Sequence, residues 1–387
     1  MSDNSILIDL PPEGLLIREL TTTAINAIAS LGDLEVFVKK NTVELKSSSR
    51  EIEYSLQKAV NGLKSVLEVK EKLVWPYLHK NDKGTLSKSN IVKEIVKESK
   101  NLNTYLDLAK LFIDNLRNLL LGQPGRHLNI SSAADKITLG KGNIALLQML
   151  KVEFYETSLK YNAPYSRNIE IRVDDAWLSL LIAGLVVSYV GAPGLLGPYE
   201  FMTTPELLSR NPMEFKRFIS INLSHVTRRV RMRPVLPYLF QIHILAKYAP
   251  KEVLNRLSSL FESGNNEPPI TRPLSFRTHM LASYGGKEYV ELSREDIILS
   301  SRILEFLDEL GEKCSQQLSD FIELAYEAKN PKVVNALTYL YEAVHDAKDP
   351  AFASYYFVRV AEEIAVEKKR PPFSSLCVER IVETLTS

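Results

Sequence analysis

The spacing of hydrophobic side chains predicts a chain that begins with β-strands and ends in helices. The first 46 residues are predicted to form β-structure. Within them, residues 34–46 alternate apolar and polar side chains around a Lys-Lys-Asn turn, as a β-hairpin does. From Ser48 to Val74 the apolar residues recur at steps of three and four, which predicts a helix. The serine run at 47–49 is placed to cap its N-terminus.

The middle of the chain mixes helical periods with polar stretches. Residues 80–90 predict an exposed loop, and residues 91–121 predict a helix that ends at Gly122. Residues 126–143 show no clear period and predict an irregular loop. A further helix is expected over 144–161, with two more over 205–222 and 235–261.

The central part of the chain contains one long apolar run, which could be either a membrane helix or a buried core helix. Residues 168–173 read as a strand, and Asp174 and Asp175 are placed to cap the helix that follows. Residues 178–190 form the longest apolar run of the chain. A membrane helix needs roughly 20 apolar residues. This shorter run therefore predicts a buried core helix.

The last quarter of the chain is helical. Four helical segments are separated by Asn330-Pro331, Asp349-Pro350 and Pro371-Pro372, and they cover 294–328, 331–347, 350–367 and 372–386. Short connections favour antiparallel neighbours, so we expect a four-helix bundle. The predicted fold class is α+β and predominantly helical. It has a mixed α/β body over 1–265, a β-like connecting segment over 266–293 and a helical bundle over 294–387.

Composition excludes several classes of protein. The 387 residues carry 48 Lys and Arg against 47 Asp and Glu, a net charge of +1, so the chain is not coated in basic charge. Apolar and charged fractions of 45% and 25% are those of a globular protein and exclude a disordered or collagen-like chain. Because the N-terminus lacks a basic stretch followed by a long apolar one, we expect no signal peptide and a cytoplasmic protein.

The sequence predicts no metal, no cofactor and no catalytic activity. Cys314 and Cys377 are not paired in a Cys-x-x-Cys motif, so we expect two small buried hydrophobes, with no disulfide framework and no zinc site. The six histidines are scattered singly. Gly140-Lys141-Gly142 lacks the spacing of a phosphate-binding loop, and no Gly-x-Ser-x-Gly motif is present. An enzyme assembled from distant residues remains an alternative; it would draw on His225, His127, Asp174 and Glu200.

Candidate binding residues come from clusters of positive charge. The segment 225–233, HVTRRVRMR, holds four arginines, and alternate ones would share one face of an extended strand. Guanidinium groups bind phosphates in bidentate fashion, so this strip predicts a nucleic-acid contact. A salt-bridged edge strand or linker is the structural alternative. The candidate nucleic-acid-binding residues are Arg228, Arg229, Arg231, Arg233, Arg126, His127, Lys136, Lys141, Arg272 and Arg277.

The order of these parts resembles a known family. A mixed α/β body without catalytic motifs precedes a helical bundle, and residues 173–198 read VDDAWLSLLIAGLVVSYVGAPGLLGP. In size, in order of parts and in the region from Asp175 to Gly194, the chain resembles the large subunit of archaeal type I-A CRISPR surveillance (Cascade) complexes. No site residue carries over from the resemblance, because no short motif aligns.

The resemblance implies a non-catalytic subunit that binds guide RNA and target DNA. Such a subunit helps recognise the protospacer-adjacent motif and recruit the helicase–nuclease. Its other partners are the backbone and small subunits of the complex, and no membrane is involved. In such complexes guide pairing supplies the sequence specificity. The alternative is a helical protein–protein interaction scaffold without nucleic-acid binding, which predicts dispersed cations and an apolar surface patch on the bundle.

Overall fold

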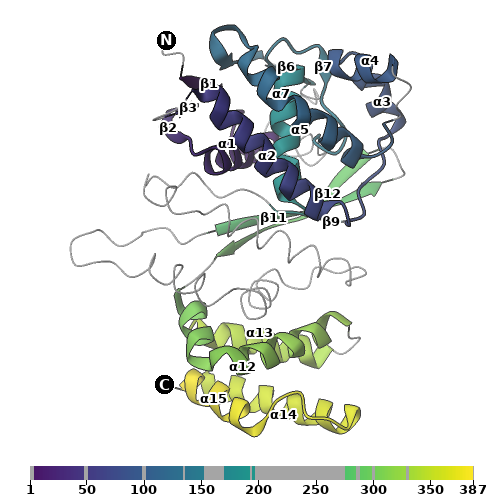
Figure 1. Ribbon diagram of the computed structural model, residues 1–387. Helices are drawn as coiled ribbons and strands as arrows, with labels where there is room; N and C mark the ends of the chain where they lie inside the picture. The colour runs from purple at the N-terminus through teal and green to yellow at the C-terminus, as the bar shows by residue number, and fades with distance from the viewer. Residues whose placement is uncertain are drawn as a thin grey trace, which may run out of the picture. The chain divides into compact units, whose positions relative to one another are not determined.

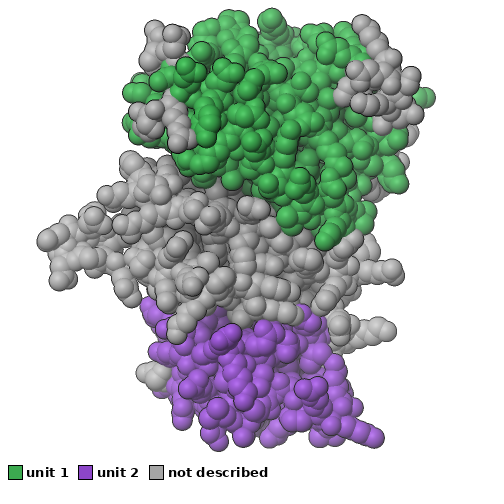
Figure 2. Space-filling view, in the orientation of Figure 1, with its two compact units in different colours: residues 1–221, 277–294 green, residues 222–276, 295–387 purple. Residues whose placement is uncertain are grey.

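The computed structural model is a mixed α+β protein in which helices predominate, which confirms the predicted fold class (Figure 1). It describes residues 4–47, 51–97, 102–133, 136–151, 170–191, 194–196, 275–284, 288–298, 301–327 and 331–386. The chain divides into two compact units (Figure 2). Unit 1 comprises residues 1–221 and 277–294, and unit 2 comprises residues 222–276 and 295–387.

The centre of unit 1 is helix α7 (Asp175–Ser188), which is buried on every side from Ala176 to Ser188. A helix that is apolar all round belongs in a core. Helices α1 (Leu16–Gly32), α2 (Ile52–Lys70) and α5 (Tyr105–Leu121) pack against it. The core helix predicted from the apolar run is confirmed. Among the described residues, no helix is both long enough and apolar enough to cross a membrane.

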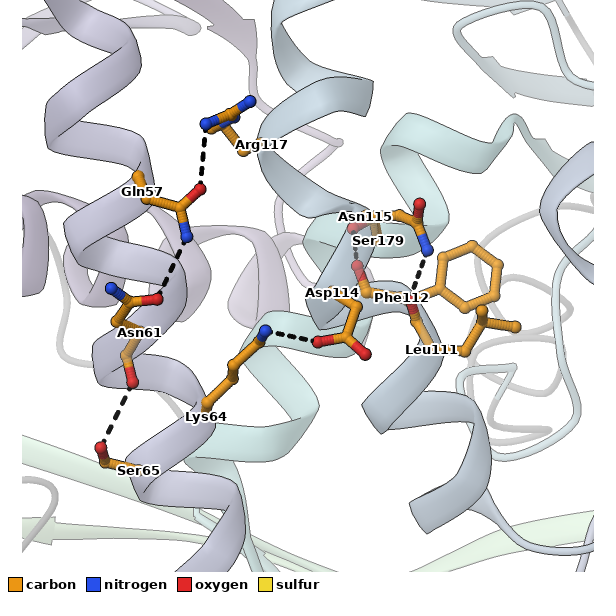
Figure 3. Close-up of polar contacts among 10 residues, drawn as sticks. All are labelled: Gln57, Asn61, Lys64, Ser65, Leu111, Phe112, Asp114, Asn115, Arg117 and Ser179. Carbon is orange, nitrogen blue, oxygen red and sulfur yellow. Dashed lines mark hydrogen bonds and ion pairs between the residues drawn. The ribbon is translucent and has the colours of Figure 1, made fainter.

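Close contacts fix α7 against its neighbours. At Gly184 a Cβ atom would lie 2.1 Å from the backbone oxygen of Leu20 in α1, so only glycine allows the two helices to cross here. The buried Ser179 Oγ donates to the backbone oxygen of Phe112 in α5 at 2.8 Å (Figure 3). The helices of unit 1 therefore meet α7 at specific, closely packed positions.

The C-terminal end of α7 is satisfied by a buried lysine. Lys70, at the end of α2, is 1% exposed, and its Nζ donates to the backbone oxygens of Val186, Val187 and Tyr189 at 2.8, 2.7 and 2.8 Å. Helix C-termini leave carbonyl groups without intrahelical partners, and a cation there also complements the helix dipole. A single ammonium group thus joins α2 to the end of α7.

The first sheet has the order β2-β3-β1-β4. Its strands are β1 (Ser5–Asp9), β2 (Glu35–Lys39), β3 (Thr42–Lys46) and β4 (His127–Leu128). The hairpin expected over 34–46 is confirmed. The expectation that all of the first 46 residues are β was wrong, because α1 lies between β1 and β2. Its run of three threonines, 21–23, is β-branched, yet it is buried within the helix and stabilised by packing.

The second sheet has the order β5-β6-β8-β7 and lies mostly where an irregular loop was predicted. Its strands are β5 (Ile130–Ala133), β6 (Lys136–Leu139), β7 (Ile144–Ala145) and β8 (Glu170–Val173). Two expectations were therefore wrong: the loop over 126–143 and the helix from 144. Strands of two to four residues are too short to show a period. Strands β5 and β6 form a local hairpin, whereas β6 and β7 both pair with β8, which is distant in sequence. The strand expected over 168–173 is confirmed as β8.

The third sheet has the order β12-β11-β10-β9. Its strands are β9 (Tyr189–Gly191), β10 (Gly194–Leu196), β11 (Ser275–Tyr284) and β12 (Glu288–Ile298). Strands β11 and β12 lie within the β-like segment predicted over 266–293, except that β12 continues to 298, and residues 266–274 lie outside the described residues. The buried His279 side chain of β11 contacts the carboxylate of Glu19 in α1 and ties this sheet to the helical core.

Helix boundaries between α2 and α5 differ from the sequence expectation. The predicted loop over 80–90 contains α3 (Lys80–Leu86), and the predicted long helix over 91–121 is interrupted between α4 (Asn90–Lys97) and α5. Thr104 begins α5 with a capping box, in which its hydroxyl accepts from the Asp107 backbone N–H. Helix α2 begins after Glu51 without a side-chain cap, so the cap predicted at 47–49 was wrong.

The C-terminal region consists of α12 (Ser301–Glu327), α13 (Pro331–Val344), α14 (Pro350–Lys368) and α15 (Ser375–Thr386). Helix α12 packs against α13 and α15, and α14 packs against the same two helices. Two of the three predicted proline boundaries, Pro331 and Pro350, start a helix, whereas α15 begins at Ser375, after Pro371-Pro372. Asp349 caps α14 by accepting from the Ala351 N–H at 3.0 Å. The predicted helical C-terminus is confirmed.

The two cysteines form a disulfide, which corrects the expectation of two unpaired buried thiols. Cys314 in α12 and Cys377 in α15 are joined across a sequence separation of 63 residues, with their Cα atoms 5.2 Å apart. Both are buried, as expected. Their spacing along the chain gave no sign of pairing, because only the packing of α12 against α15 brings them together.

A Cβ atom at the α1–α7 crossing should destabilise unit 1. We expect Gly184→Ala to lower the free energy of unfolding by about 1–3 kcal/mol, since the added methyl group meets backbone that cannot move aside. Gly84→Ala is the matched control, because a Cβ there meets nothing within 4 Å. It should be neutral or stabilising. Chemical denaturation of both variants measures the difference, and equal stabilities would contradict the tight crossing.

The disulfide should stabilise the C-terminal helices. Closing a loop of this length corresponds to about 4 kcal/mol in the chain-entropy model. We expect the Cys314→Ala/Cys377→Ala variant to lose most of this stabilisation free energy. Dithiothreitol should lower the unfolding midpoint of the wild type but not that of the variant. A wild-type midpoint that does not respond to complete reduction, confirmed by thiol labelling in denaturant, would show that the bond contributes nothing.

Candidate nucleic-acid interface

One face of the sheet β5-β6-β8-β7 carries polar and charged side chains. Strands β6 and β8 are parallel, with Lys136 opposite Glu170 and Thr138 opposite Arg172. Alternate residues of a strand share a face, so these four side chains lie on one side of the sheet. Ile137, Leu139 and Val173 are buried on the other side.

The turn between β6 and β7 crosses this outward face. Gly142 lies over it so closely that a Cβ atom would come within 2.2 Å of Thr138 Cγ2 and 3.3 Å of Arg172 Cβ. Gly140 and Gly142 have positive φ angles of 66° and 59°, a region that favours glycine. The two glycines therefore let the turn, which carries the exposed Lys141, lie against the face of the sheet that holds Thr138 and Arg172.

Asp174 holds the turn in place. Its Oδ1 accepts from the Trp177 N–H at 2.9 Å, which caps α7 as the sequence predicted. Its Oδ2 accepts from the Lys141 N–H at 3.0 Å, and a Cβ on Gly140 would lie 1.9 Å from that oxygen. Asp175 acts elsewhere, because its Oδ2 accepts from the Asn90 N–H at the start of α4. One carboxylate thus couples the buried helix to the exposed turn.

Four cations gather on this face, and we call Lys88, Lys136, Lys141 and Arg172 the basic face. Asn143 Nδ2 donates to the backbone oxygen of Lys88 at 3.3 Å, which places Lys88 beside the turn. Arg172 Nε donates to Glu170 Oε1 at 2.7 Å. This hydrogen bond, with the positive charges of Arg172, Lys136 and Lys88, lowers the pKa of Glu170. The carboxylate is therefore ionised but outnumbered by cations.

Comparison with protein-family models, with curated proteins and with solved structures finds no match. What this surface can do follows from its own geometry. Three flexible ammonium groups and one guanidinium group on an exposed sheet face can neutralise several phosphates of a polyanion.

The structure brings together only some of the residues predicted from sequence. Lys136 and Lys141 belong to the basic face, whereas Arg126 and His127 lie at the first sheet. There His127 Nε2 lies 3.0 Å from Asp9 Oδ1, and Asp9 also accepts from Thr42 Oγ1 and the Ile130 N–H. This places His127 in a polar junction between strands. Arg277 lies in β11, and Arg228, Arg229, Arg231, Arg233 and Arg272 lie outside the described residues.

Sequence reasoning missed Lys88 and Arg172. Arg172 had a detectable signal, because it alternates with two apolar residues in a predicted strand and so belongs to its polar face. Lys88 had no detectable signal in the sequence. It follows α3, and the contact of its backbone oxygen with Asn143 places it beside the turn. The grouping of residues 88, 136, 141 and 172 depends on strand pairing and on a turn contact, so local spacing does not predict it.

A second polar group is buried and serves the fold. Asp82 Oδ2 accepts from Tyr105 Oη at 2.9 Å, its Oδ1 accepts from the Gln148 N–H at 2.9 Å, and Tyr105 Oη accepts from the Met149 N–H at 3.1 Å. Burial raises the pKa of Asp82 and of Tyr105, and it raises the pKa of the neighbouring Tyr289 to about 12. These bonds tie α3 and residues 148–149 to α5.

The residues named for a dispersed enzyme site have other contacts where they are described. His127 lies in the Asp9 junction and Asp174 caps α7, while His225 and Glu200 lie outside the described residues. Within the part of the chain that the structure describes, no group of three or more His, Cys, Asp or Glu side chains could hold a metal ion.

Proposed function

We propose that the chain is a non-catalytic nucleic-acid-binding subunit, and that it acts as the large subunit of a CRISPR RNA-guided surveillance complex. The observation that carries the nucleic-acid role is the basic face, where Arg172, Lys136 and Lys88 act on the one carboxylate, Glu170, and the adjacent turn carries Lys141, in a protein of net charge +1. The resemblance in the order of parts and in residues 175–194 supports the assignment to the complex. In that role the subunit helps recognise the protospacer-adjacent motif and recruits the helicase–nuclease.

The chemistry of the basic face suits phosphates better than bases. Lysine side chains contact the backbone of a nucleic acid as point charges and carry no sequence information. The closely packed turn over Thr138 and Arg172 fixes where the charges of Lys141 and Arg172 are presented. We infer that this face positions the guide or target strand by its backbone, while pairing with the guide reads the sequence.

A second candidate function is protein docking by the C-terminal helices, which we propose form an antiparallel four-helix bundle. The supporting observation is aromatic surface on α13 and α14. The rings of Tyr339, Phe352 and Tyr356 contact one another, and Lys348 Nζ lies 4.5 Å from the centroid of Tyr339. Phe352 and the neighbouring Tyr355 are 44% and 63% exposed. Exposed aromatic clusters of this kind are typical of protein–protein contacts. An assembly subunit would use both surfaces.

Removing two lysines of the basic face should change the salt dependence of binding. We expect Lys136→Ala/Lys141→Ala to weaken binding to labelled single-stranded RNA and duplex DNA. We also expect the double variant to reduce the magnitude of the slope of log binding constant against log salt concentration by about 1–2. Each lost phosphate contact lowers that slope by roughly 0.7–0.9. Fluorescence anisotropy titrations over a range of salt concentrations measure this slope.

The matched control removes the same charge from another surface. Lys64 and Lys110 pair with Asp114 and Glu71 across α2 and α5, at 2.7 and 2.8 Å (Figure 3 shows Lys64 with Asp114). Lys64→Ala/Lys110→Ala should leave the slope unchanged. If both double variants lower it equally, binding is nonspecific and the basic face is not the interface. Arg229→Ala/Arg231→Ala tests the arginine strip in the same assay.

The assignment to a surveillance complex predicts specific partners. A tagged chain purified from its native host should retain short guide RNAs and other subunits of the complex. Sequencing and mass spectrometry of nuclease-treated and untreated halves identify them. Recovery of protein partners alone, unchanged by nuclease, would contradict the nucleic-acid role and favour the scaffold function of the C-terminal helices.

A further inference from the structure

Strand β2 is an edge strand that displays apolar side chains on both faces. Among the residues that the structure describes, β2 lies at the edge of its sheet and pairs with β3 alone. Phe37 is 43% exposed and Val38 is 49% exposed, and as neighbours in a strand they point to opposite faces. The β2–β3 register runs without a shift from Glu35 to Lys39, and the strand contains no proline. Bulges and prolines, two of the ways in which an edge is protected, are therefore absent from this strand.

The backbone of β2 is oriented to accept another strand. Lys39 and Thr42 flank a two-residue turn, and such flanking residues form a hydrogen-bonded pair in a hairpin. Because hydrogen-bonded and non-hydrogen-bonded pairs alternate along an antiparallel ladder, Phe37 also directs its backbone groups toward β3. Val36 and Val38 then direct theirs to the open edge.

The sequence of the strand is complementary to itself. It reads Glu35-Val36-Phe37-Val38-Lys39, with one charge of each sign at its ends and phenylalanine at its centre. In an antiparallel pair of two such strands centred on Phe37, each glutamate lies opposite a lysine and each Val36 lies opposite a Val38. Opposite charges in directly opposed positions stabilise a strand pair, and like charges destabilise it.

We propose that two copies of this chain associate through their β2 strands, antiparallel and with Phe37 opposite Phe37. In this register Val36 of one copy and Val38 of the other form the hydrogen-bonded pairs, so the pairing uses the backbone groups that β3 leaves open. The two phenylalanines form the closer, non-hydrogen-bonded pair and cover each other's exposed rings. The twofold symmetry of this contact is that of most protein dimers.

We assign the partner as a second copy because Glu35 and Lys39 of this strand are complementary to the same two residues in an antiparallel copy. An unrelated peptide would have to supply matching charges of its own. Lys39 is 71% exposed, and its Nζ lies 3.0 Å from Glu44 Oε2 on the adjacent strand. It can therefore contact a glutamate from a second copy while it remains beside Glu44. One short strand buries little surface, so we expect a weak dimer with a dissociation constant in the micromolar range or above. This inference is independent of the proposed nucleic-acid role.

A charge-exchange experiment on the full chain tests the register. Sedimentation equilibrium of the wild type over a wide concentration range should show a monomer–dimer equilibrium. Glu35→Lys and Lys39→Glu should each weaken it by about tenfold or more, because each places like charges opposite one another at both ends of the strand. The double variant Glu35→Lys/Lys39→Glu should restore dimerisation, and so should an equimolar mixture of the two single variants.

Three outcomes would overturn the proposal. These are a wild type that stays monomeric at the highest concentration reached, single variants that dimerise like the wild type, and a mixture no more associated than its components. Val38→Pro removes an N–H at the open edge and should abolish the dimer. Circular dichroism and thermal unfolding establish whether each variant is folded. The charge variants lie on exposed positions, so the test stands even if the proline variant fails to fold.

Discussion

The complete burial of α7 is the constraint on which the rest of unit 1 depends. A helix surrounded by apolar side chains cannot turn its unpaired terminal N–H and C=O groups to water, so side chains must satisfy them. Asp174 accepts from the N–H of Trp177 at one end, and the Lys70 ammonium group donates to three carbonyl oxygens at the other. Each cap is also a tertiary contact: Asp174 holds the turn at Lys141, and Lys70 brings the end of α2 to β9. Capping the buried helix therefore positions an exposed turn and a sheet.

This coupling explains why the candidate interface lies where it does. The turn at 140–143 needs two glycines with positive φ angles because it is confined between the Asp174 carboxylate and the outward face of the sheet. Lys141 is presented beside Arg172 as a consequence of that confinement. The basic face is thus connected through Asp174 to the buried helix α7. An interface that contacts phosphates through long side chains gains affinity when its backbone is rigid, because less conformational freedom is lost on binding.

The other surfaces differ in chemistry and in how they are supported. The exposed faces of α2 and α5 carry cations too, but each is paired with a neighbouring carboxylate, as Lys64 is with Asp114 (Figure 3). The C-terminal helices expose aromatic rings and are held together covalently between α12 and α15. Strand β2 exposes apolar side chains at the edge of its sheet, as formed by the described strands. In its chemistry, one region thus suits a polyanion, and two suit apolar protein surfaces.

The sequence by itself determined those helices, strands and caps that depend only on residues close together in the chain. The 34–46 hairpin, strand β8, the Asp174 cap, the buried apolar helix and the four C-terminal helices with their proline boundaries all follow from period, length or capping chemistry. Tertiary structure decided the remainder. Helix α1 forms despite its three consecutive threonines because burial outweighs intrinsic propensity, and the short strands β6 and β7 are held in a sheet by the distant strand β8. The same holds for chemistry: the sequence identified Lys136 and Lys141 as cations, but only the sheet placed them beside Arg172 and Lys88. Cys314 and Cys377 likewise became a disulfide only when α15 packed on α12, because proximity between distant residues is a property of the folded chain.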